Sequence, residues 1–471
     1  MTASRGGEKL SLTEKVGYAV GDTASNIYFQ TFLYFILFYY TDVVGLSAGA
    51  VATMFAVSRV WDAFNDPAMG TIADRTNTRW GKFRPFLLWG AVPFGVFGFL
   101  TFVTPDFDPT GKLIYAYLTY NLLMMAYTAI NVPYAALMGV ITPNSLERTS
   151  LASYRFVGVF VGALIVQSAT LPLVAYFGQG DQARGWRITM AILSALAIGL
   201  FFTTFATTRE RVQPPPGQKG DFARDLKDLF TNRPWLLIGA ATIFQLGFIV
   251  VRSSSVAYYF KYYVGDQQLQ FMGSTIPLSF EAFSSSFLIS GSLITIGATM
   301  LTRWFAQWFG KGAAYTGFLA ISAVAQALFF VVEPHNVIAI YLLNAVVSFA
   351  WGPVSALQWS MYTDCADHLE WTKNRRVTGL LMAASLFALK MGLAIGGAFV
   401  GWTLEYHGFV ANVDQAPEAL TGIRFLMSFY PAMFGVVGVV LMFFYPLTNQ
   451  TMAVIERELK TRRAAAQEGV E

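Results

Sequence analysis

The feature that most constrains the fold of this chain is a series of long apolar segments that recurs along nearly all of its 471 residues. An apolar run of about 20 residues is long enough to cross the hydrocarbon core of a bilayer as a helix. Only 13% of the residues are charged, whereas an average soluble domain has about 25%. The sequence therefore predicts an all-α integral membrane protein. Twelve spanning helices are expected, near residues 16–40, 48–72, 85–104, 112–141, 151–177, 187–206, 235–263, 285–309, 312–333, 336–363, 377–405 and 421–446.

A polar segment at residues 207–233 separates the first six expected spans from the last six. It contains the three consecutive prolines Pro214–Pro216 and a charged run that begins at Asp221, where a short amphipathic helix is expected over 221–230. Six spans, a linker and six more are typical of transporters built from two parallel repeats. The expected parts are an N-terminal bundle at 1–206, a linker at 207–233, a C-terminal bundle at 234–447 and a tail at 448–471.

The basic residues gather in alternate loops. Arg and Lys are frequent after the second span, in the linker, before the eleventh span and in the tail, whereas the opposite loops are mostly acidic or nearly neutral. The exception follows the fifth span, where Arg184 and Arg187 outnumber Asp181. Because Lys and Arg favour the cytoplasmic side, both termini are expected in the cytoplasm. The protein is expected in a plasma or bacterial inner membrane. No cleavable signal is expected.

The composition also argues against several classes of protein. The single Cys365 excludes an intrachain disulfide, and the three histidines are not spaced as metal ligands. The sequence has no His-Glu-x-x-His, Gly-x-Ser-x-Gly or glycine-rich phosphate loop. We therefore expect no enzyme, no cofactor and no nucleic-acid partner, and a monomer in the bilayer.

Two carboxylates lie inside the second expected span. Asp62 and Asp66 are four residues apart, which stacks them on one helical face beside Asn65. A carboxylate at the centre of a membrane costs about 2.5–3.5 kcal/mol on insertion scales, so two of them in one span indicate an oxygen-rich pocket for a small cation or a proton. The alternative is structural, with the carboxylates pairing with Arg59, Arg155 or Lys390 to hold helices together.

Further polar residues are expected within other spans. In the first span, Asp22 and Asn26 share a face, and in the fourth span Thr128 and Asn131 precede the helix-distorting Pro133. Carboxylates, amides and cations interleaved with aromatic rings suit the recognition of a polyhydroxylated ligand. The alternatives are a packing or capping role for Asp22 and a snorkelling side chain for Arg252. The basic residues expected in or near the spans are Arg155, Arg252 and Lys390.

Two charged clusters are expected to form a gate at the ends of helices. Asp364 and Asp367 precede the basic segment 373–376, which ends in Arg376 and suggests an interhelical salt-bridge network. Asp74 and Arg75 adjoin a short basic loop and suggest a second charge latch, although a plain positive-inside loop has the same composition.

Three motifs resemble one transporter family. Tyr40–Leu46 (YTDVVGL), Arg59–Pro67 (RVWDAFNDP) and Arg79–Pro85 (RWGKFRP) are similar to segments of the glycoside–pentoside–hexuronide:cation symporters. These form the melibiose-permease-like branch of the major facilitator superfamily. The resemblance runs the whole length of the chain and is most specific in the second motif. It implies the major facilitator fold, with twelve transmembrane helices in two pseudo-symmetric six-helix bundles, and alternating access around one central site.

The resemblance also implies roles for individual residues. Arg155 would approach the sugar, and Lys390 would lie near both the sugar and the cation. The melibiose permease binds its galactoside with two carboxylates, and at the matching positions this chain has Asn26 and Asn131. Asp22 could replace one of those two carboxylates. At two positions where the family has aromatic residues, this chain has Ala135 and Ser355. The implied cation site is Asp62, Asn65, Asp66 and Thr128, with Asp62 and Asp66 as metal ligands if the ion is Na⁺.

The sequence as a whole predicts a secondary active transporter. We expect Na⁺- or H⁺-coupled symport of a sugar or glycoside into the cytoplasm, with a neutral glycoside slightly favoured over a uronide or a sulfonated sugar. A lysolipid or other amphiphile carrier, a passive sugar facilitator and a non-transporting sensor are the alternatives. The expected substrate-binding residues are Asp22, Asn26, Tyr127, Asn131, Arg155, Arg252 and Lys390.

Overall fold

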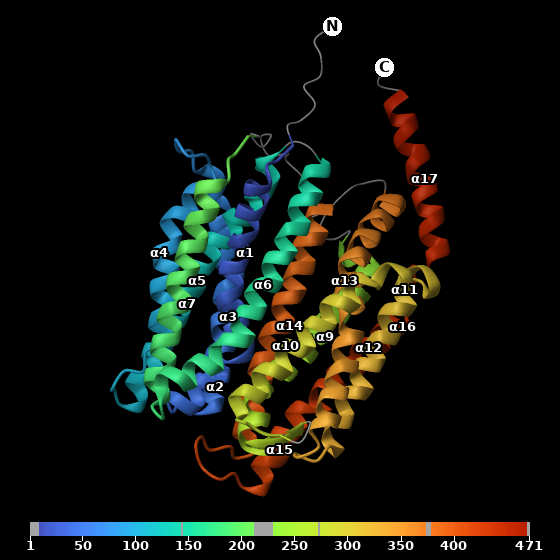
Figure 1. The fold of residues 1–471 in the computed structure, drawn as a ribbon. Coiled ribbons are helices and arrows are strands. Elements are labelled where there is room, and N and C mark those ends of the chain that lie inside the picture. The colour runs from blue at the N-terminus through green and yellow to red at the C-terminus, as the bar shows by residue number, and fades with distance from the viewer. Residues whose placement is uncertain (1–8, 143–144, 212–228, 272–273, 374–377, 469–471) are drawn as a thin grey trace. The chain divides into compact units, whose positions relative to one another are not determined.

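The computed structural model describes residues 9–142, 145–211, 229–271, 274–373 and 378–468 (Figure 1). Long helices dominate these residues, which form two compact units. The N-terminal unit comprises residues 1–217 with two short segments, 281–286 and 410–413, and the C-terminal unit comprises the rest. Each unit is described by itself.

The N-terminal unit is a bundle of long helices with short connections. Its core contains large aromatic side chains, such as Trp186, which stacks on Phe102 at a centroid distance of 5.5 Å. The elements are α1 (Leu12–Tyr34), α2 (Ile36–Phe38), the π-helix η1 (Tyr39–Val43), α3 (Ala48–Arg75), α4 (Arg84–Thr101), α5 (Pro109–Ile141), α6 (Ser145–Gly178) and α7 (Gln182–Thr207).

Side-chain caps fix where several of these helices begin. Ser11 accepts a hydrogen bond from a backbone N–H in the first turn of α1, and Ser47, Asp108 and Asp181 do the same for α3, α5 and α7. Such caps satisfy backbone donors that have no partner within the helix and typically contribute about 1 kcal/mol each.

The C-terminal unit begins with α9 (Arg233–Tyr258) and has a second buried core around Trp235, Tyr315 and Tyr362. The elements that follow are the π-helix η2 (Tyr259–Val264), β1 (Gln267–Phe271), β2 (Ser274–Leu278), α10 (Phe280–Met300), α11 (Thr302–Phe309), α12 (Lys311–Ala327), the 3₁₀-helix η3 (Leu328–Val331), α13 (Val337–Lys373), α14 (Thr378–Tyr406), α15 (Pro417–Met427), α16 (Phe429–Phe443) and α17 (Asn449–Glu468).

Ten helical segments of the described chain are long and apolar enough to cross a membrane. The helices α1 and α3, which lie at the first two predicted spans, are not among them. The α1 helix carries Glu14, Lys15 and Asp22, and α3 contains a shorter apolar stretch, Ala48–Ser58. The ten spanning segments lie at the other ten predicted positions, and α17 lies in the expected tail.

The structure differs from the sequence-based expectation in several segments. A short antiparallel hairpin, β1–β2, pairs Gln267 with Leu278 between the seventh and eighth expected spans. The expected eighth span is divided at Leu301 into α10 and α11, and the twelfth is divided at Ser428 into α15 and α16. The helix expected at 221–230 falls mostly on residues 212–228, which lie outside the described part of the chain.

Candidate functional site

A carboxylate and a guanidinium meet between two helices of the N-terminal unit. Asp22 lies on α1 and Arg155 on α6, and the Arg155 Nε donates to Asp22 Oδ2. The carboxylate side chain is only 6% exposed, whereas the arginine side chain is 32% exposed. The pair therefore holds α1 to α6 and still presents one side of the guanidinium to the surroundings. Arg155 was considered as a partner for Asp62 and Asp66; its ion pair in the described chain is with Asp22.

Two tyrosines support this ion pair from a third helix. Tyr134 of α5 stacks on Tyr18 of α1 with a centroid distance of 4.6 Å. Each hydroxyl donates to the other residue's backbone carbonyl, over 3.1 Å from Tyr18 and 2.7 Å from Tyr134. The Arg155 Cζ lies 5.4 Å from the Tyr134 ring centroid, within cation–π range. The guanidinium is thus held by the Asp22 carboxylate and by the Tyr134 ring, whose position is fixed by the hydrogen bonds between Tyr134 and Tyr18.

The two asparagines expected in the substrate site lie on the neighbouring turns of α1 and α5. The Asn131 Oδ1 accepts from Ser25 Oγ over 2.7 Å, and its Nδ2 donates to the Tyr127 carbonyl over 3.0 Å. The Asn26 Nδ2 donates to the Asp22 carbonyl over 2.9 Å. The structure therefore groups Asp22, Asn26, Tyr127, Asn131 and Arg155 on three packed helices of one unit, with the buried Thr128 beside Tyr127.

The carboxylates of the expected cation site lie on α3, which packs against α5. The helical backbone places Asp62 and Asp66 on one face of α3. Their side chains lie outside the described residues, so the cation site stays a prediction. Asn65 is described: its Nδ2 is buried and has no hydrogen-bond partner in the described chain.

In the C-terminal unit, Arg252 is buried rather than snorkelling. It is 6% exposed, its Nε donates to Gln326 Oε1 over 2.9 Å, and its Nη2 donates to Asn344 Oδ1. The guanidinium also lies 5.4 Å from the Phe287 ring centroid. These contacts join α9 to α10, α12 and α13. Lys390, the other basic residue expected in the site, is half-buried on α14.

The expected gate residues are only partly described. Asp364 on α13 is buried, and both its oxygens accept from Lys311 Nζ of α12, at 2.7 and 2.8 Å. Lys311 was not predicted, since no local pattern links it to a residue 53 positions away. Asp367 is half-buried. Arg376 and the side chains of Asp74 and Arg75 lie outside the described residues.

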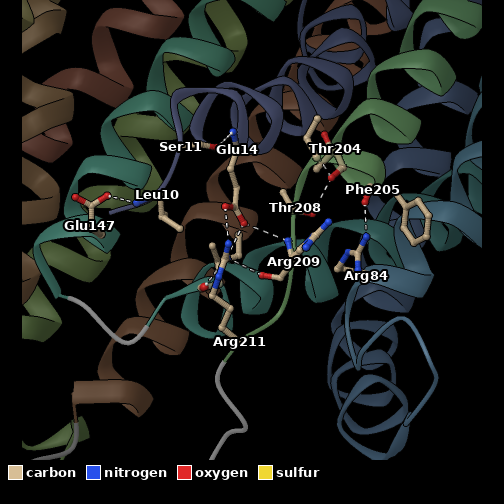
Figure 2. Close-up of polar contacts among 12 residues, drawn as sticks. Leu10, Ser11, Glu14, Arg84, Glu147, Thr204, Phe205, Thr208, Arg209 and Arg211 are labelled. Atoms are coloured by element: carbon tan, nitrogen blue, oxygen red, sulfur yellow. Dashed lines mark hydrogen bonds and ion pairs between the residues drawn. The ribbon is translucent and has the colours of Figure 1, made fainter. Parts of the chain in front are cut away.

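A second polar network, missed by sequence reasoning, lies where α1 begins (Figure 2). Glu14 accepts from Arg211 Nη1 and Nη2 over 2.7 and 2.9 Å, and from the Arg209 backbone N–H. Glu147 accepts from Lys15 Nζ over 2.9 Å and from the Leu10 backbone N–H over 3.1 Å. The network ties the segment after α7 and the start of α6 to the start of α1.

Comparison with known proteins identifies the family. The family model described as "MFS/sugar transport protein" matches residues 17–449. The chain belongs to this family. It is a multi-pass membrane transporter with the all-α major facilitator fold and not an enzyme, which confirms the predicted fold class and the absence of an enzyme activity.

Curated relatives of this transporter align along nearly its whole length. A protein named "Putative glycoside/cation symporter YagG" from Escherichia coli (strain K12) is 38% identical, covering 98% of each chain. An "Isoprimeverose transporter" from Lactiplantibacillus pentosus is 35% identical over 92% of this chain and 88% of the relative. A "Glucuronide carrier protein homolog" from Escherichia coli (strain K12) is 30% identical over 98% of both. The resemblance to the glycoside–pentoside–hexuronide symporters is thereby confirmed.

A solved structure shows the same fold at much lower identity. It is that of a bacterial homologue of the human drug peptide transporters PepT1 and PepT2, with a TM-score of 0.66 at 13% identity, covering 95% of this chain and 99% of the other. This likeness concerns the fold alone; the family model and the curated relatives show that the transporter is of the cation/sugar symporter type within the superfamily.

Proposed function

We propose that this transporter carries a sugar or glycoside into the cytoplasm together with Na⁺ or H⁺, by alternating access, and prefers a neutral glycoside to a uronide or a sulfonated sugar. The observation that carries the proposal is the group of polar side chains on α1, α5 and α6, in which Asp22, Arg155 and Asn131 lie on packed helices. The names of two relatives, which specify a glycoside and isoprimeverose, support the same substrate class.

The chemistry of this group suits a polyhydroxylated ligand. Each sugar hydroxyl donates one hydrogen bond and can accept two, so the several hydroxyls of a sugar can together bind a guanidinium, an amide and a carboxylate. The partly exposed Arg155 supplies donors, and the asparagines Asn26 and Asn131 supply carbonyl oxygens. Such groups fix the orientation of a sugar without requiring a charge on it.

Coupling would arise from the α3 carboxylates. Two negative charges on one face of a membrane helix are costly and repel each other, so a bound cation stabilises the pair. Carboxylate oxygens suit a hard cation such as Na⁺, and a shared proton neutralises them as well. If the sugar binds better to the cation-loaded form, each ligand strengthens the other by about 1–3 kcal/mol. Asn65 and Thr128 would complete the cation site.

We place the transporter in the bacterial inner membrane, and the distribution of Lys and Arg supports an orientation with both termini in the cytoplasm. The described segment that leaves α7 is basic, with Arg209 and Arg211 near the start of α1. A monomer would suffice for this function, because transporters built from two repeats carry both repeats in one chain.

Uptake into proteoliposomes tests the proposal. A labelled panel of neutral glycoside, uronide and sulfonated sugar is supplied under an inward Na⁺ gradient or an inward proton gradient. We expect one gradient to drive accumulation of the neutral glycoside, and Asp62→Asn and Asp66→Asn to abolish it. Asp106→Asn, in an exposed loop, is the matched control and should retain uptake. Uptake that is independent of both gradients would indicate a facilitator. Inhibition of uptake by a lysolipid and not by unlabelled sugar would indicate an amphiphile carrier.

A further inference from the structure

We propose that Asp22 determines which charge class of sugar this transporter accepts, by neutralising Arg155 so that a sugar with a carboxylate is rejected. This inference rests on the proposed function and adds the residue that sets its selectivity. It gives Asp22 a role distinct from hydrogen bonding to the sugar.

The geometry of the pair makes Arg155 a donor of hydrogen bonds with its charge already balanced. Its Nε is occupied by Asp22 Oδ2. In the described chain its two terminal amino groups have no hydrogen-bond partner, and its side chain is 32% exposed. A neutral hydroxyl can bind these amino groups without disturbing the ion pair, since it brings no charge of its own.

An anionic ligand meets a different situation. A sugar carboxylate that contacts the terminal amino groups of Arg155 would lie close to the Asp22 carboxylate on the other edge of the guanidinium. Two carboxylates close together disfavour each other's charged form, and Asp22 is buried, so water screens it poorly. Without the Asp22 charge, the same guanidinium becomes a ready partner for a carboxylate, because Arg pairs with carboxylates through two parallel hydrogen bonds.

The surroundings keep the pair from separating to accommodate such a ligand. The Tyr134 ring supports the guanidinium and is locked to Tyr18 by two hydrogen bonds. The helices α1 and α6 also approach closely at Gly158, where an added Cβ would lie 2.2 Å from the Ala19 carbonyl oxygen. Asp22 and Arg155 are therefore preorganised by backbone packing as well as by their own contact.

The test measures competition between two sugars that differ only at C6, which is a hydroxymethyl group in one and a carboxylate in the other. Uptake of a labelled neutral β-methyl glucoside is competed with unlabelled β-methyl glucoside or with β-methyl glucuronide. In the wild type, we expect the glucuronide to compete at least tenfold more weakly. In Asp22→Asn, the ratio should shift at least tenfold toward the glucuronide, and adding Arg155→Gln to that variant should remove the gain. Asp22→Glu, which keeps the charge, should retain the preference of the wild type.

Each outcome separates this inference from the proposed function. If the wild type transports no sugar, the proposed function fails. If the wild type transports the neutral sugar and folded Asp22→Asn shows an unchanged ratio, the inference alone is overturned. Equal competition by both sugars in the wild type also overturns it. Asp22→Ser is the second variant should Asp22→Asn not fold, because it also removes the charge and leaves a small polar side chain. Asp106→Asn controls for the loss of a carboxylate elsewhere and should leave the ratio unchanged.

Discussion

The helix pair α1–α6 in the N-terminal unit and the helix pair α9–α14 in the C-terminal unit use the same packing device. On α6, glycines four residues apart face α1: a Cβ on Gly158 would lie 2.2 Å from the Ala19 carbonyl oxygen, and one on Gly162 would lie 2.8 Å from the Thr23 carbonyl oxygen. In membrane proteins such small residues let helix backbones approach closely.

The α14 helix repeats this arrangement against α9. A Cβ on Gly392 would lie 2.6 Å from the Ile243 carbonyl oxygen, and one on Gly396 would lie 2.8 Å from the Val250 Cβ. The spacing of four residues is the same, so the two units share one solution for packing these helices.

The two pairs differ in the side chains beside the glycines. Asp22 lies three residues after Ala19 on α1, whereas Leu246 lies three residues after Ile243 on α9. Arg155 precedes Gly158 by three residues, whereas Leu389 precedes Gly392 by three. The close packing is thus common to both units, and the ion pair is an addition to the N-terminal one. In the C-terminal unit, a buried arginine is instead held by the amides of Gln326 and Asn344.

The largest effect is expected from filling the close contacts. Gly158→Val should destabilise the protein by about 3 kcal/mol, because the backbone of α1 cannot move away without losing the rest of the helix contact. Gly392→Val should cost less, since the corresponding distance is longer. The thermal unfolding midpoint in detergent measures both. Gly199→Val is the matched control because its Cβ would meet nothing within 4 Å. Equal thermal unfolding midpoints for Gly158→Val and Gly199→Val would contradict the close packing of α6 against α1.

The amide support of Arg252 gives the next largest effect. Gln326→Leu removes the acceptor of the Arg252 Nε in a buried site, so we expect a loss of about 2 kcal/mol, within the range for hydrogen bonds to charged groups. Gln307→Leu, on the exposed surface of α11, is the control. Thermal unfolding again reports the difference, and a variant as stable as the wild type would show that the amide contributes little to holding this arginine.

A smaller effect is expected at the start of α4. Glu210, in the segment after α7, accepts backbone hydrogen bonds from Lys82, Phe83 and Arg84 over 2.8, 2.7 and 2.9 Å. A carboxylate at a helix N-terminus is favoured by the helix dipole as well, so Glu210→Gln should cost about 1 kcal/mol. The exposed Glu333→Gln is the control. If Glu210→Gln and Glu333→Gln lose the same amount of stability, the segment after α7 is held by Glu14 instead.

The smallest effect depends on pH. The hydrogen bond from Lys15 lowers the pKa of the Glu147 carboxyl below its ordinary value of 4.5. A lowered folded-state pKa stabilises the protein at pH values above the ordinary pKa, and this stabilisation disappears as the pH falls through the lowered value. The wild type should therefore unfold at a higher temperature than Glu147→Gln at pH 7, with the difference vanishing in acid. A difference that persists unchanged below pH 3 would contradict this.

The sequence by itself determined the features that depend on local spacing. Apolar length predicted where the long helices lie, because a bilayer of fixed thickness requires about 20 apolar residues. The motif around Asp62 and Asp66 indicated the family and placed both residues on one helical face, because four residues is about one helical turn. The pairs Gly158–Gly162 and Gly392–Gly396 have the same four-residue spacing, but only the structure shows which helix each pair faces.

Only the tertiary structure decided which charged groups meet. Asp22 and Arg155 are 133 residues apart, and Lys311 and Asp364 are 53 apart, so no helical periodicity relates them. The sequence suggested the basic segment 373–376 as the salt-bridge partner of Asp364, because a linear pattern reveals only charges that are close in sequence. The ion pairs instead follow from which helices pack together. For Asp22 and Arg155, the backbones of α1 and α6 approach closely at Gly158 and Gly162.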